Sequence, residues 1–291
     1  PGEGIEPVVG ETHITSRGDT VLGADAKAGI TVILNAVRQV IADQIPHGEL
    51  QVVFCIAEET GLYGARHLDY SRVSPHLCYV LDGGKSPGTM TVAAPSAYKL
   101  TYQVKGRAAH AGVRPEEGIN AIQVAAQGLA RMKLGRVDHE TTANVGIIEG
   151  GQARNIVPDR CTLYAEARSH NDDKLERQVR HMTMCLQHAA DENGAELAEP
   201  EIELSYRRFH LDQDAPVVRL AWEAALALGF EPVAEIGGGG SDANIFNARG
   251  IPALILSTGA ENPHTLEERL DIEAMVGSMR WVVEIIRRAE W

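Results

Sequence analysis

The segment Gln51–Gly64, QVVFCIAEETGLYG, constrains the fold more than any other part of the chain. It opens with an apolar run over 52–56, continues with the adjacent carboxylates Glu58 and Glu59, and breaks at Gly61. A short apolar run that ends in glycine is typical of a buried strand in an α/β sheet. Because charges do not continue into a buried strand, we expect both carboxylates at its carboxyl end, where open α/β sheets bind ligands.

Two adjacent carboxylates at a sheet edge repel each other unless a cation lies between them or one of them carries a proton. A metal ion meets this condition, because one carboxylate can ligate it while the other acts as a general base toward water. The alternative is that Glu58 and Glu59 form a solvated strand end or a first helical turn, where carboxylates are common. The rest of the chain favours the metal site.

Two further carboxylates lie at boundaries of predicted elements in the same α/β block. Asp25 directly precedes a helix that apolar spacing predicts over 30–45, a place where an isolated Asp ordinarily caps the helix. Asp82 follows an apolar strand predicted over 77–81 and precedes a Gly-Gly pair, as a turn Asp also does. Together with the Glu pair, these placements indicate one carboxylate cluster rather than unrelated caps and turns.

The last part of the chain returns to an α/β pattern. After an apolar helix predicted from Ala215, the glycine-rich segment 237–244 lacks the lysine of a P-loop and the strand-GxGxxG order of a dinucleotide fold. We therefore interpret it as a loop packed beneath an active site. A strand predicted over 251–256 leads to a polar loop with His264, a possible metal ligand, although most such histidines are merely solvated. A helix over 272–288 closes the domain.

Around residue 95 the hydrophobic pattern changes to a half-exposed strand with period two, predicted over 98–105. Downstream, helices are predicted over 120–132 and 172–193, and strands over 143–148, 160–167 and 201–206. The order β-α-β-β-α-β is the ferredoxin-like split βαβ pattern. We therefore predict an α/β domain made of residues 1–95 and 208–291, with an inserted ferredoxin-like α+β domain over residues 96–207.

Composition limits the classes of partner. The net charge of −13 argues against nucleic acid and against an anionic membrane surface. The four cysteines show no CxxC spacing, and Cys55 and Cys78 lie in apolar runs, which favours free thiols in a reducing cytoplasm. No segment has the length and hydropathy of a membrane span, and no signal peptide is evident, so we expect a cytoplasmic protein without a membrane partner.

Five motifs occur in one fixed order: GADAKAG at 23–29, AEETG at 57–61, LDGG at 81–84, GRAAHAG at 106–112 and NPHT at 262–265. Each motif alone is weak, but the ordered set resembles the dinuclear zinc peptidases related to peptidase T, carboxypeptidase G and the aminoacylases. Within them it looks most like the peptidase T-like branch. The resemblance covers essentially the whole chain and implies a zinc-peptidase-like α/β catalytic domain with an inserted ferredoxin-like lid and dimerisation domain.

The resemblance implies a role for each matching residue of the α/β domain. Asp25 would bridge two Zn²⁺ ions, for which Mn²⁺ or Co²⁺ could substitute, and Asp82 would ligate the first ion. Glu59 and His264 would ligate the second ion. Glu58 would be the general base, which agrees with the expectation that one member of the Glu pair binds metal while the other stays free.

Three residues of the inserted domain also match the family. His110 resembles the histidine that reaches into the active site of the partner subunit and polarises the scissile carbonyl. Arg168 matches the arginine that holds a substrate carboxylate, although a surface arginine on a strand is the alternative. Asn155 matches a substrate-binding position. The resemblance therefore implies a short peptide as substrate and a homodimer formed through the inserted domain.

One motif of the family is missing from this chain. The family's first metal ligand is a histidine in a His-x-Asp-Thr motif, which in the peptidase T-like branch directly precedes a Pro-Gly segment like the one at Pro1. His13 does not substitute for it, because no Asp stands two residues later. The chain also begins without a methionine, so we expect the missing motif in an upstream part of a longer protein.

These patterns predict a metal-dependent hydrolase that cleaves peptide bonds of short peptides, as an aminopeptidase or tripeptidase with a dinuclear zinc site. One alternative is an N-acyl amino acid amidohydrolase or carboxypeptidase of the same family, which substrate profiling would separate. A second alternative is a non-catalytic relative that binds peptides or metabolites. A third is a structural protein in which the inserted domain mediates dimerisation, and metal content would distinguish it from the enzymes.

Overall fold

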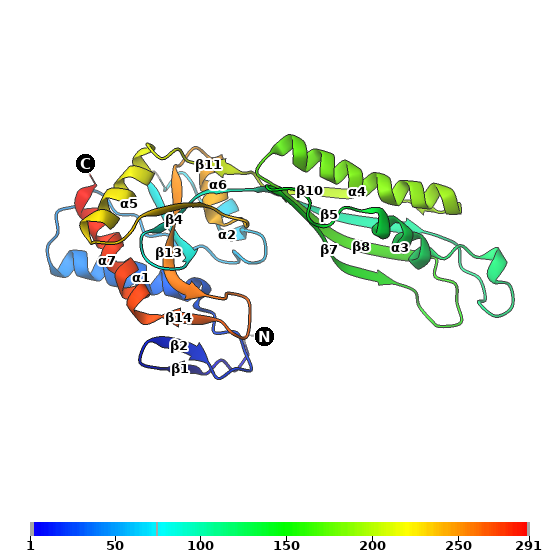
Figure 1. Ribbon diagram of the computed structural model, residues 1–291, viewed down its shortest axis with the longest axis horizontal. Coiled ribbons are helices and arrows are strands. Elements are labelled where there is room, and N and C mark those ends of the chain that lie inside the picture. The colour runs from blue at the N-terminus through cyan, green and yellow to red at the C-terminus, as the bar shows by residue number, and fades with distance from the viewer. Residues whose placement is uncertain (1–2, 74, 290–291) are drawn as a thin grey trace. The chain divides into compact units, whose positions relative to one another are not determined.

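A computed structural model describes residues 3–73 and 75–289 of the chain. The chain divides into two compact units. The first unit contains the chain up to Ala94 and from Phe209 onward, and the second runs from Pro95 to Arg208. Their elements are labelled in Figure 1. Each unit has its own sheet and its own hydrophobic core.

The first unit is built on a mixed sheet with eight strands. At its centre, β13 (Ala253–Glu261) pairs in parallel with β3 (Cys78–Gly84) and antiparallel with β4 (Thr89–Ala94). β4 also pairs in parallel with β12 (Val233–Ile236). Because the parallel strands β3 and β13 end at the same edge, the residues that follow them come close together there.

Shorter strands extend this sheet. An N-terminal hairpin is formed by β1 (Pro7–Val9) and β2 (His13–Ser16), which pair antiparallel. β2 also pairs with β14 (Arg269–Asp271), and β14 pairs with the end of β13. β11 (Phe209–His210) pairs antiparallel with β4. The hairpin therefore joins the sheet through β14.

Helices cover both faces of this sheet (Figure 1). One face is covered by α1 (Ala24–Ala42), α5 (Pro216–Ala227) and α7 (Ile272–Arg288). The other face is covered by α6 (Asp242–Ala248), which packs against α2 (Tyr63–Arg66). The arrangement is the three-layered α/β architecture that the sequence predicts.

The side chains of β13 show how this layering follows from the sequence. Leu254 and Leu256 belong to the core cluster shared with α5 and α7, and Ala253 and Ile255 belong to the cluster shared with α6. Successive side chains of a strand point to opposite faces, so a continuous apolar run is needed where helices cover both faces. At the centre of the first cluster, Trp281 is fully buried and its indole N–H donates to the Ala221 carbonyl at 2.8 Å.

The second unit has an antiparallel sheet in the order β10-β5-β8-β7, the strand order of a ferredoxin-like fold. The strands are β5 (Ser96–Lys105), β7 (Thr141–Gly150), β8 (Arg160–Ser169) and β10 (Glu201–Tyr206). The chain order β5-α3-β7-β8-α4-β10 confirms the predicted split βαβ pattern.

Two helices cover the apolar face of this second sheet. α3 (Ala121–Arg131) and α4 (Asp172–Asn193) pack against each other and against the sheet. Both are capped as their sequences suggest, because the side chains of Asn120 and Asn171 accept the N–H of the third helical residue. Short strands β6 (Gly135–Arg136) and β9 (Glu196–Leu197) pair with β7 and β5.

One local prediction in this unit is wrong. The segment 51–57 forms no strand, and alternate apolar side chains at Val52, Phe54 and Ile56 are exposed. No strand among the described residues pairs with it, so its apolar side chains lack a covering layer on one side. The segment is followed by the single helical turn α2. An apolar run indicates burial only where the neighbouring elements that bury it are present.

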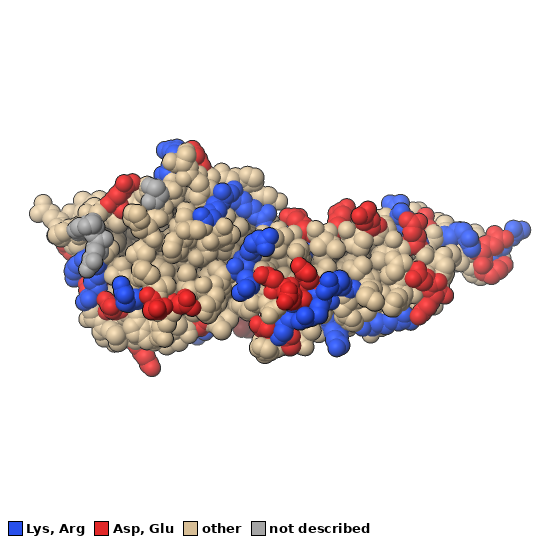
Figure 2. Space-filling view, turned by 90° about the horizontal axis from the view of Figure 1, so that it is seen from above, with Lys and Arg blue, Asp and Glu red and all other residues tan. Residues whose placement is uncertain are grey.

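Three further properties of the structure concern membrane-spanning helices, cysteine thiols and surface charge. Among residues 3–73 and 75–289, no helix combines the length and the hydropathy that crossing a membrane requires. The cysteines at 55, 78, 161 and 185 are all free thiols, as expected from their spacing. On the face drawn in Figure 2, Lys and Arg side chains are interspersed with Asp and Glu side chains.

Candidate metal centre

Three predicted ligands meet in the first unit. Asp25, Glu59 and His264 each offer one ligand atom, and these atoms lie within 4.8 Å of one another. His264 Nε2 lies 3.2 Å from Asp25 Oδ2 and 3.1 Å from Glu59 Oε1. In a tetrahedral zinc site with ligand bonds of about 2.0–2.1 Å, neighbouring ligand atoms are about 3.3 Å apart. The spacing and the donor types therefore fit a divalent ion such as Zn²⁺, Mn²⁺ or Co²⁺.

Asp25 reaches this cluster from the start of α1. The backbone of Asp25 is not helical (φ −80°, ψ 112°), and the helix has Gly23 as its N-cap with no side-chain capping bond. Asp25 therefore does not cap its own helix, which was the ordinary alternative for an aspartate in this place. Its side chain is only 20% exposed and is directed toward His264.

The Glu pair lies in a tight turn. The N–H groups of Gly61 and Leu62 both donate to the Glu58 carbonyl, at 3.0 and 2.8 Å. Ala57 and Leu62, on either side of the pair, have positive φ values of 55° and 60°. Non-glycine residues adopt this conformation at a cost of about 1–3 kcal/mol and often do so at functional sites. The pair precedes α2, which begins at Tyr63. The structure therefore excludes the alternative that Glu58 and Glu59 form the first turn of a helix.

His264 lies in the loop between β13 and β14, and it too has a positive φ, of 64°, as does Asn262 (51°). Two bonds fix the loop: the Thr265 hydroxyl donates to the Asn262 carbonyl at 2.8 Å, and the Glu268 N–H donates to the Thr265 carbonyl at 3.2 Å. His264 is thus held in a folded loop rather than in a freely solvated one, although its side chain remains 63% exposed.

Asp82 was predicted to follow the end of its strand but lies inside β3, because β3 continues through Gly83 and Gly84. A Cβ on Gly83 would stand 2.9 Å from the Leu256 carbonyl oxygen, and one on Gly84 would stand 3.0 Å from that of Ala260. The glycines therefore permit a close approach of β3 to β13. Asp82 remains next to Asp25, with a hydrogen bond between the two carboxyl groups.

The carboxyl groups of this cluster perturb one another. Burial, followed by the nearby Asp25 carboxylate, raises the pKa of Asp82 to about 9. Burial, followed by the neighbouring carboxylate of Glu59, raises the pKa of Glu58 to about 7. Partial burial acts to lower the pKa of His264, but the carboxylates around it outweigh this and raise it. Such a concentration of negative charge is what a bound cation neutralises.

The second unit places its three predicted residues in two regions. His110 and Asn155 lie in neighbouring loops, joined by an Ala111 N–H donating to the Asn155 carbonyl at 2.9 Å, and both are exposed. Arg168 lies near the opposite end of β8, about 25–30 Å from the start of that strand. It forms an ion pair of 2.9 Å with Glu166. Within the second unit, Arg168 therefore does not share a site with His110.

Two acidic residues near the centre were not singled out by the sequence. Glu268 is 2% exposed and binds the backbone at the start of α1. Asp242 follows the glycine-rich loop, and its Oδ1 is buried with no hydrogen-bond partner among the described residues. Burial and then Asp242 raise the pKa of the Cys55 thiol to about 12. Their only sequence signals are another Glu pair at 267–268 and the Ser-Asp pair before α6, and both are common on surfaces.

Comparison of this chain with known proteins identifies its family. Residues 96–194 match the peptidase dimerisation domain of M20 peptidases. The chain is 41% identical over 289 residues to the uncharacterised YqjE protein of Bacillus subtilis, covering 99% of this chain and 78% of that protein. Members of the M20 family include a peptidase described as binding a dinuclear metal centre.

Two solved structures are also similar. A tripeptidase from Staphylococcus aureus has a TM-score of 0.91 at 41% identity, over 97% of this chain and 76% of the other. The aminopeptidase PepT from Bacillus cereus has a TM-score of 0.86 at 40% identity, over 99% of this chain and 77% of the other. The chain belongs to the M20 peptidase family, in its peptidase T-like branch.

Proposed function

We propose that this protein is a metal-dependent hydrolase that cleaves peptide bonds in short peptides, with a free amino terminus as the recognised end. The observation that carries the proposal is the meeting of Asp25, Glu59 and His264 within ligand distance, with Glu58 adjacent. The two similar structures are those of a tripeptidase and an aminopeptidase, which supports the same reaction class.

The ligand set is proposed from the chemistry of its donors. Asp25, Glu59 and His264 would hold one Zn²⁺, Mn²⁺ or Co²⁺ ion, and Asp82 would contribute to a second ion that Asp25 bridges. Ions in such a centre supply positive charge that polarises the scissile carbonyl and favours ionisation of water. The remaining chemistry belongs to side chains of the chain itself.

Glu58 is proposed as the general base. It adjoins the ligand cluster but is not one of its three members, so its carboxylate is available for proton transfer. Glu58 would accept a proton from the attacking water and pass it to the leaving amine when the C–N bond breaks. This division of labour uses both members of the Glu pair and leaves their negative charge compensated by the bound cations.

His110, Asn155 and Arg168 are proposed to act on the substrate. His110 is exposed in its loop, and its imidazole would donate a hydrogen bond to the scissile carbonyl oxygen in the active site of a second copy of the chain. Arg168 would bind the carboxylate of the peptide in a two-pronged contact. Its Nε is buried without a partner among the described residues. Asn155 would bind the peptide through its amide.

A homodimer through the second unit is supported by the free edge of β7. β6 covers only the start of this strand, opposite Thr142 and Ala143. From Asn144 to Gly150 no described strand pairs with that edge. Ile147 and Ile148 are 55% and 47% exposed on this segment. An exposed apolar edge strand is a template for pairing with another chain.

The test compares wild-type protein with Glu58→Gln. Release of free amino groups is measured on a tripeptide, on its N-acetylated form and on an N-acyl amino acid, and bound metal is measured by elemental analysis. We expect wild type to cleave only the unmodified tripeptide. The variant should keep its metal and lose about 10²–10⁴-fold in turnover, the usual contribution of a general base.

The outcomes separate the proposed function from its alternatives. Cleavage of the N-acyl amino acid in preference to the tripeptide would replace the peptidase by an amidohydrolase. Absence of metal after loading would indicate a non-catalytic relative. Full activity in Glu58→Gln would remove Glu58 as the base. Loss of metal in Glu58→Gln would instead make Glu58 a ligand.

A further inference from the structure

Glu268 differs from the other acidic side chains near the candidate metal centre in being buried against backbone N–H groups. Glu268 and Glu284 are the two buried glutamates of the described residues, at 2% and 8% exposure. Glu284 is paired with Arg287 and Arg288 at 3.0 and 2.6 Å. Glu268 has no cationic partner among the described ion pairs and instead accepts two backbone N–H groups. A buried carboxylate needs such compensation, because an uncompensated one is expensive.

The two N–H groups that Glu268 accepts belong to Gly23 and Asp25, on either side of Ala24. Gly23 N–H donates to Glu268 Oε2 at 2.6 Å, and Asp25 N–H donates to Glu268 Oε1 at 3.0 Å. Gly23 is the N-cap of α1 and Asp25 is its second residue, so both N–H groups lie at the start of the helix, where backbone donors lack partners within the helix. Gly23 has no side chain to cap the helix, so Glu268 supplies the carboxylate that a capping residue would provide.

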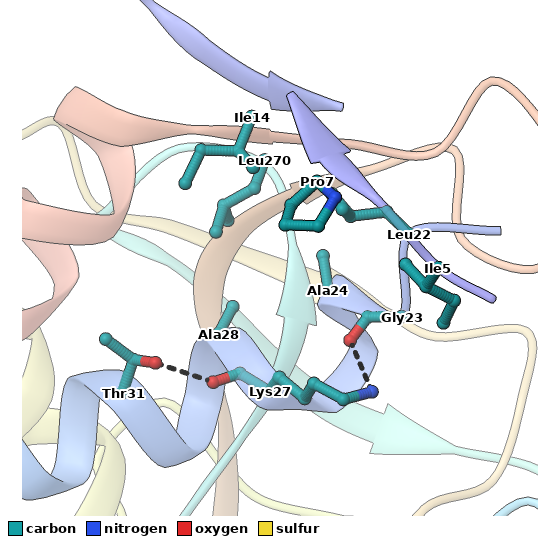
Figure 3. Close-up of a pocket in the computed structure, with 10 residues that line it drawn as sticks. All are labelled: Ile5, Pro7, Ile14, Leu22, Gly23, Ala24, Lys27, Ala28, Thr31 and Leu270. Atoms are coloured by element: carbon teal, nitrogen blue, oxygen red, sulfur yellow. Dashed lines mark hydrogen bonds between the residues drawn. The ribbon is translucent and has the colours of Figure 1, made fainter. Parts of the chain in front are cut away.

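A second contact fixes the same glycine from its other side. Lys27 Nζ donates to the Gly23 carbonyl at 3.2 Å, as the dashed line in Figure 3 shows. Gly23 has φ 72°, a left-handed conformation in which a side chain would be strained. Both polar groups of Gly23 are therefore held, and the direction in which the chain enters α1 and presents Asp25 is set by these contacts.

Glu268 itself belongs to the loop that carries His264, so it connects this loop to the start of α1. Glu268 follows His264 by four residues, and its own N–H donates to the Thr265 carbonyl at 3.2 Å. One side chain thus joins two segments that lie 243 residues apart in the sequence. These are the segments that supply Asp25 and His264, whose ligand atoms are 3.2 Å apart.

We propose that Glu268 is a positioning residue of the metal centre, which sets the distance and orientation between Asp25 and His264. Its two oxygens hold the Asp25 backbone while its own backbone is continuous with the His264 loop. The inference rests on the proposed metal centre. Residues that orient metal ligands in this indirect way typically contribute 10- to 100-fold, in order of magnitude, to metal affinity.

Glu268→Gln tests the proposal, and Glu267→Gln is its matched control. The glutamine keeps one carbonyl oxygen as acceptor but turns an NH₂ group toward the second backbone N–H, so one of the two bonds is lost. Glu267 is the exposed neighbour with the same charge, so its variant changes net charge equally without touching α1. The probe is Co²⁺, whose visible absorption reports the coordination geometry.

We expect Co²⁺ to bind about 10- to 100-fold more weakly to Glu268→Gln, with an altered visible spectrum at saturation, and Glu267→Gln to match wild type. The spectrum at saturation is recorded on folded, loaded protein, so it tests orientation even where the metal-free variant is less stable. Wild-type affinity and spectrum in Glu268→Gln would overturn the inference. Failure of wild type itself to bind Co²⁺ would instead overturn the proposed metal centre.

Discussion

Replacing Gly29 by alanine tests whether the close approach of α1 to β3 sets the spacing of the metal centre. Gly29 is buried in α1, and a Cβ at this position would lie 2.1 Å from the Leu81 carbonyl oxygen. Leu81 directly precedes Asp82 in β3, and Gly29 is four residues from Asp25 in α1. The contact therefore joins the two elements that carry these carboxylates.

The expected effect can be worked from the geometry. Contacts of Cβ below 3.0 Å essentially do not occur, so helix and strand must separate by at least about 0.9 Å, the difference between 3.0 and 2.1 Å. The obstacle is a backbone oxygen, which cannot turn aside as a side chain can. Overpacking of a core costs about 1–3 kcal/mol, and the alanine regains about 1 kcal/mol of helix propensity. We expect a net loss of about 0–2 kcal/mol in the free energy of unfolding.

Metal binding should respond more strongly than stability. Functional groups must stay within about 0.5 Å of their productive geometry, and the required displacement of about 0.9 Å exceeds that limit. We expect metal affinity to fall by at least about tenfold. Unfolding of the first unit can be followed in urea by tryptophan fluorescence, because all three tryptophans of the sequence lie after Arg208. Metal affinity is measured by calorimetric titration of the same protein.

Gly128→Ala in α3 provides a control that is matched in chemistry. A Cβ on Gly128 would lie 2.7 Å from Leu186 Cδ2 and 3.0 Å from its Cα, so this variant also introduces a helix clash. Gly128 belongs to the second unit, which contains none of the candidate metal ligands. The Gly128→Ala variant should therefore lose stability and keep the metal affinity of the wild-type protein. If Gly29→Ala bound metal as tightly as wild type, the close approach of α1 and β3 would not set the metal geometry.

Two further predictions concern the second unit. Ile148→Lys places a charge on the exposed edge of β7, so a homodimer through this edge should dissociate to monomers in sedimentation velocity; a dimer unchanged in this variant would refute that interface. The Glu140 N–H, followed by smaller contributions from Thr141 and Lys174, lowers the pKa of Asp138 to about 2. Because the pKa of Asp138 is lower in the folded state, its carboxylate stabilises the folded protein above about pH 4. This stabilisation is lost as the pH falls toward 2. The urea midpoint from circular dichroism should therefore drop more between pH 4 and 2 in wild type than in Asp138→Asn, and equal slopes would contradict this assignment.

Much of the fold was predictable because its strongest periodicities coincide with complete elements. The helices predicted over 172–193 and 272–288 have the bounds of α4 and α7, and the strand over 201–206 has those of β10. These elements bury one regular face, so their sequence pattern and their environment agree. β14 and β12 were missed, because strands of three and four residues are too short to establish a period.

The sequence predicted the proposed ligands of the candidate metal centre, but it did not predict the contacts that hold them in place. Asp25, Glu59 and His264 are visible in the sequence because carboxylates and a histidine follow apolar runs, and their order resembles a known family. Nothing local distinguishes Glu268 from Glu267, because the difference between them is burial against a helix start over 240 residues earlier in the chain. Long-range contacts of this kind leave no periodic signal.

The contacts that hold the ligands explain how a chain can tolerate so many carboxylates in one place. Asp25 is held by the backbone bonds to Glu268, Asp82 by the pairing of β3 with β13, and the Glu pair by its own turn. None of these contacts involves a cation, so the fold itself brings the carboxyl groups together, and the raised pKa values of Asp82 and Glu58 reflect the cost of ionising them there. A ligand that binds only the folded state returns free energy, about 2.7 kcal/mol at a concentration one hundred times its Kd. Binding of the proposed metal would offset the cost of preorganising the carboxylates and would couple the stability of the first unit to its proposed function.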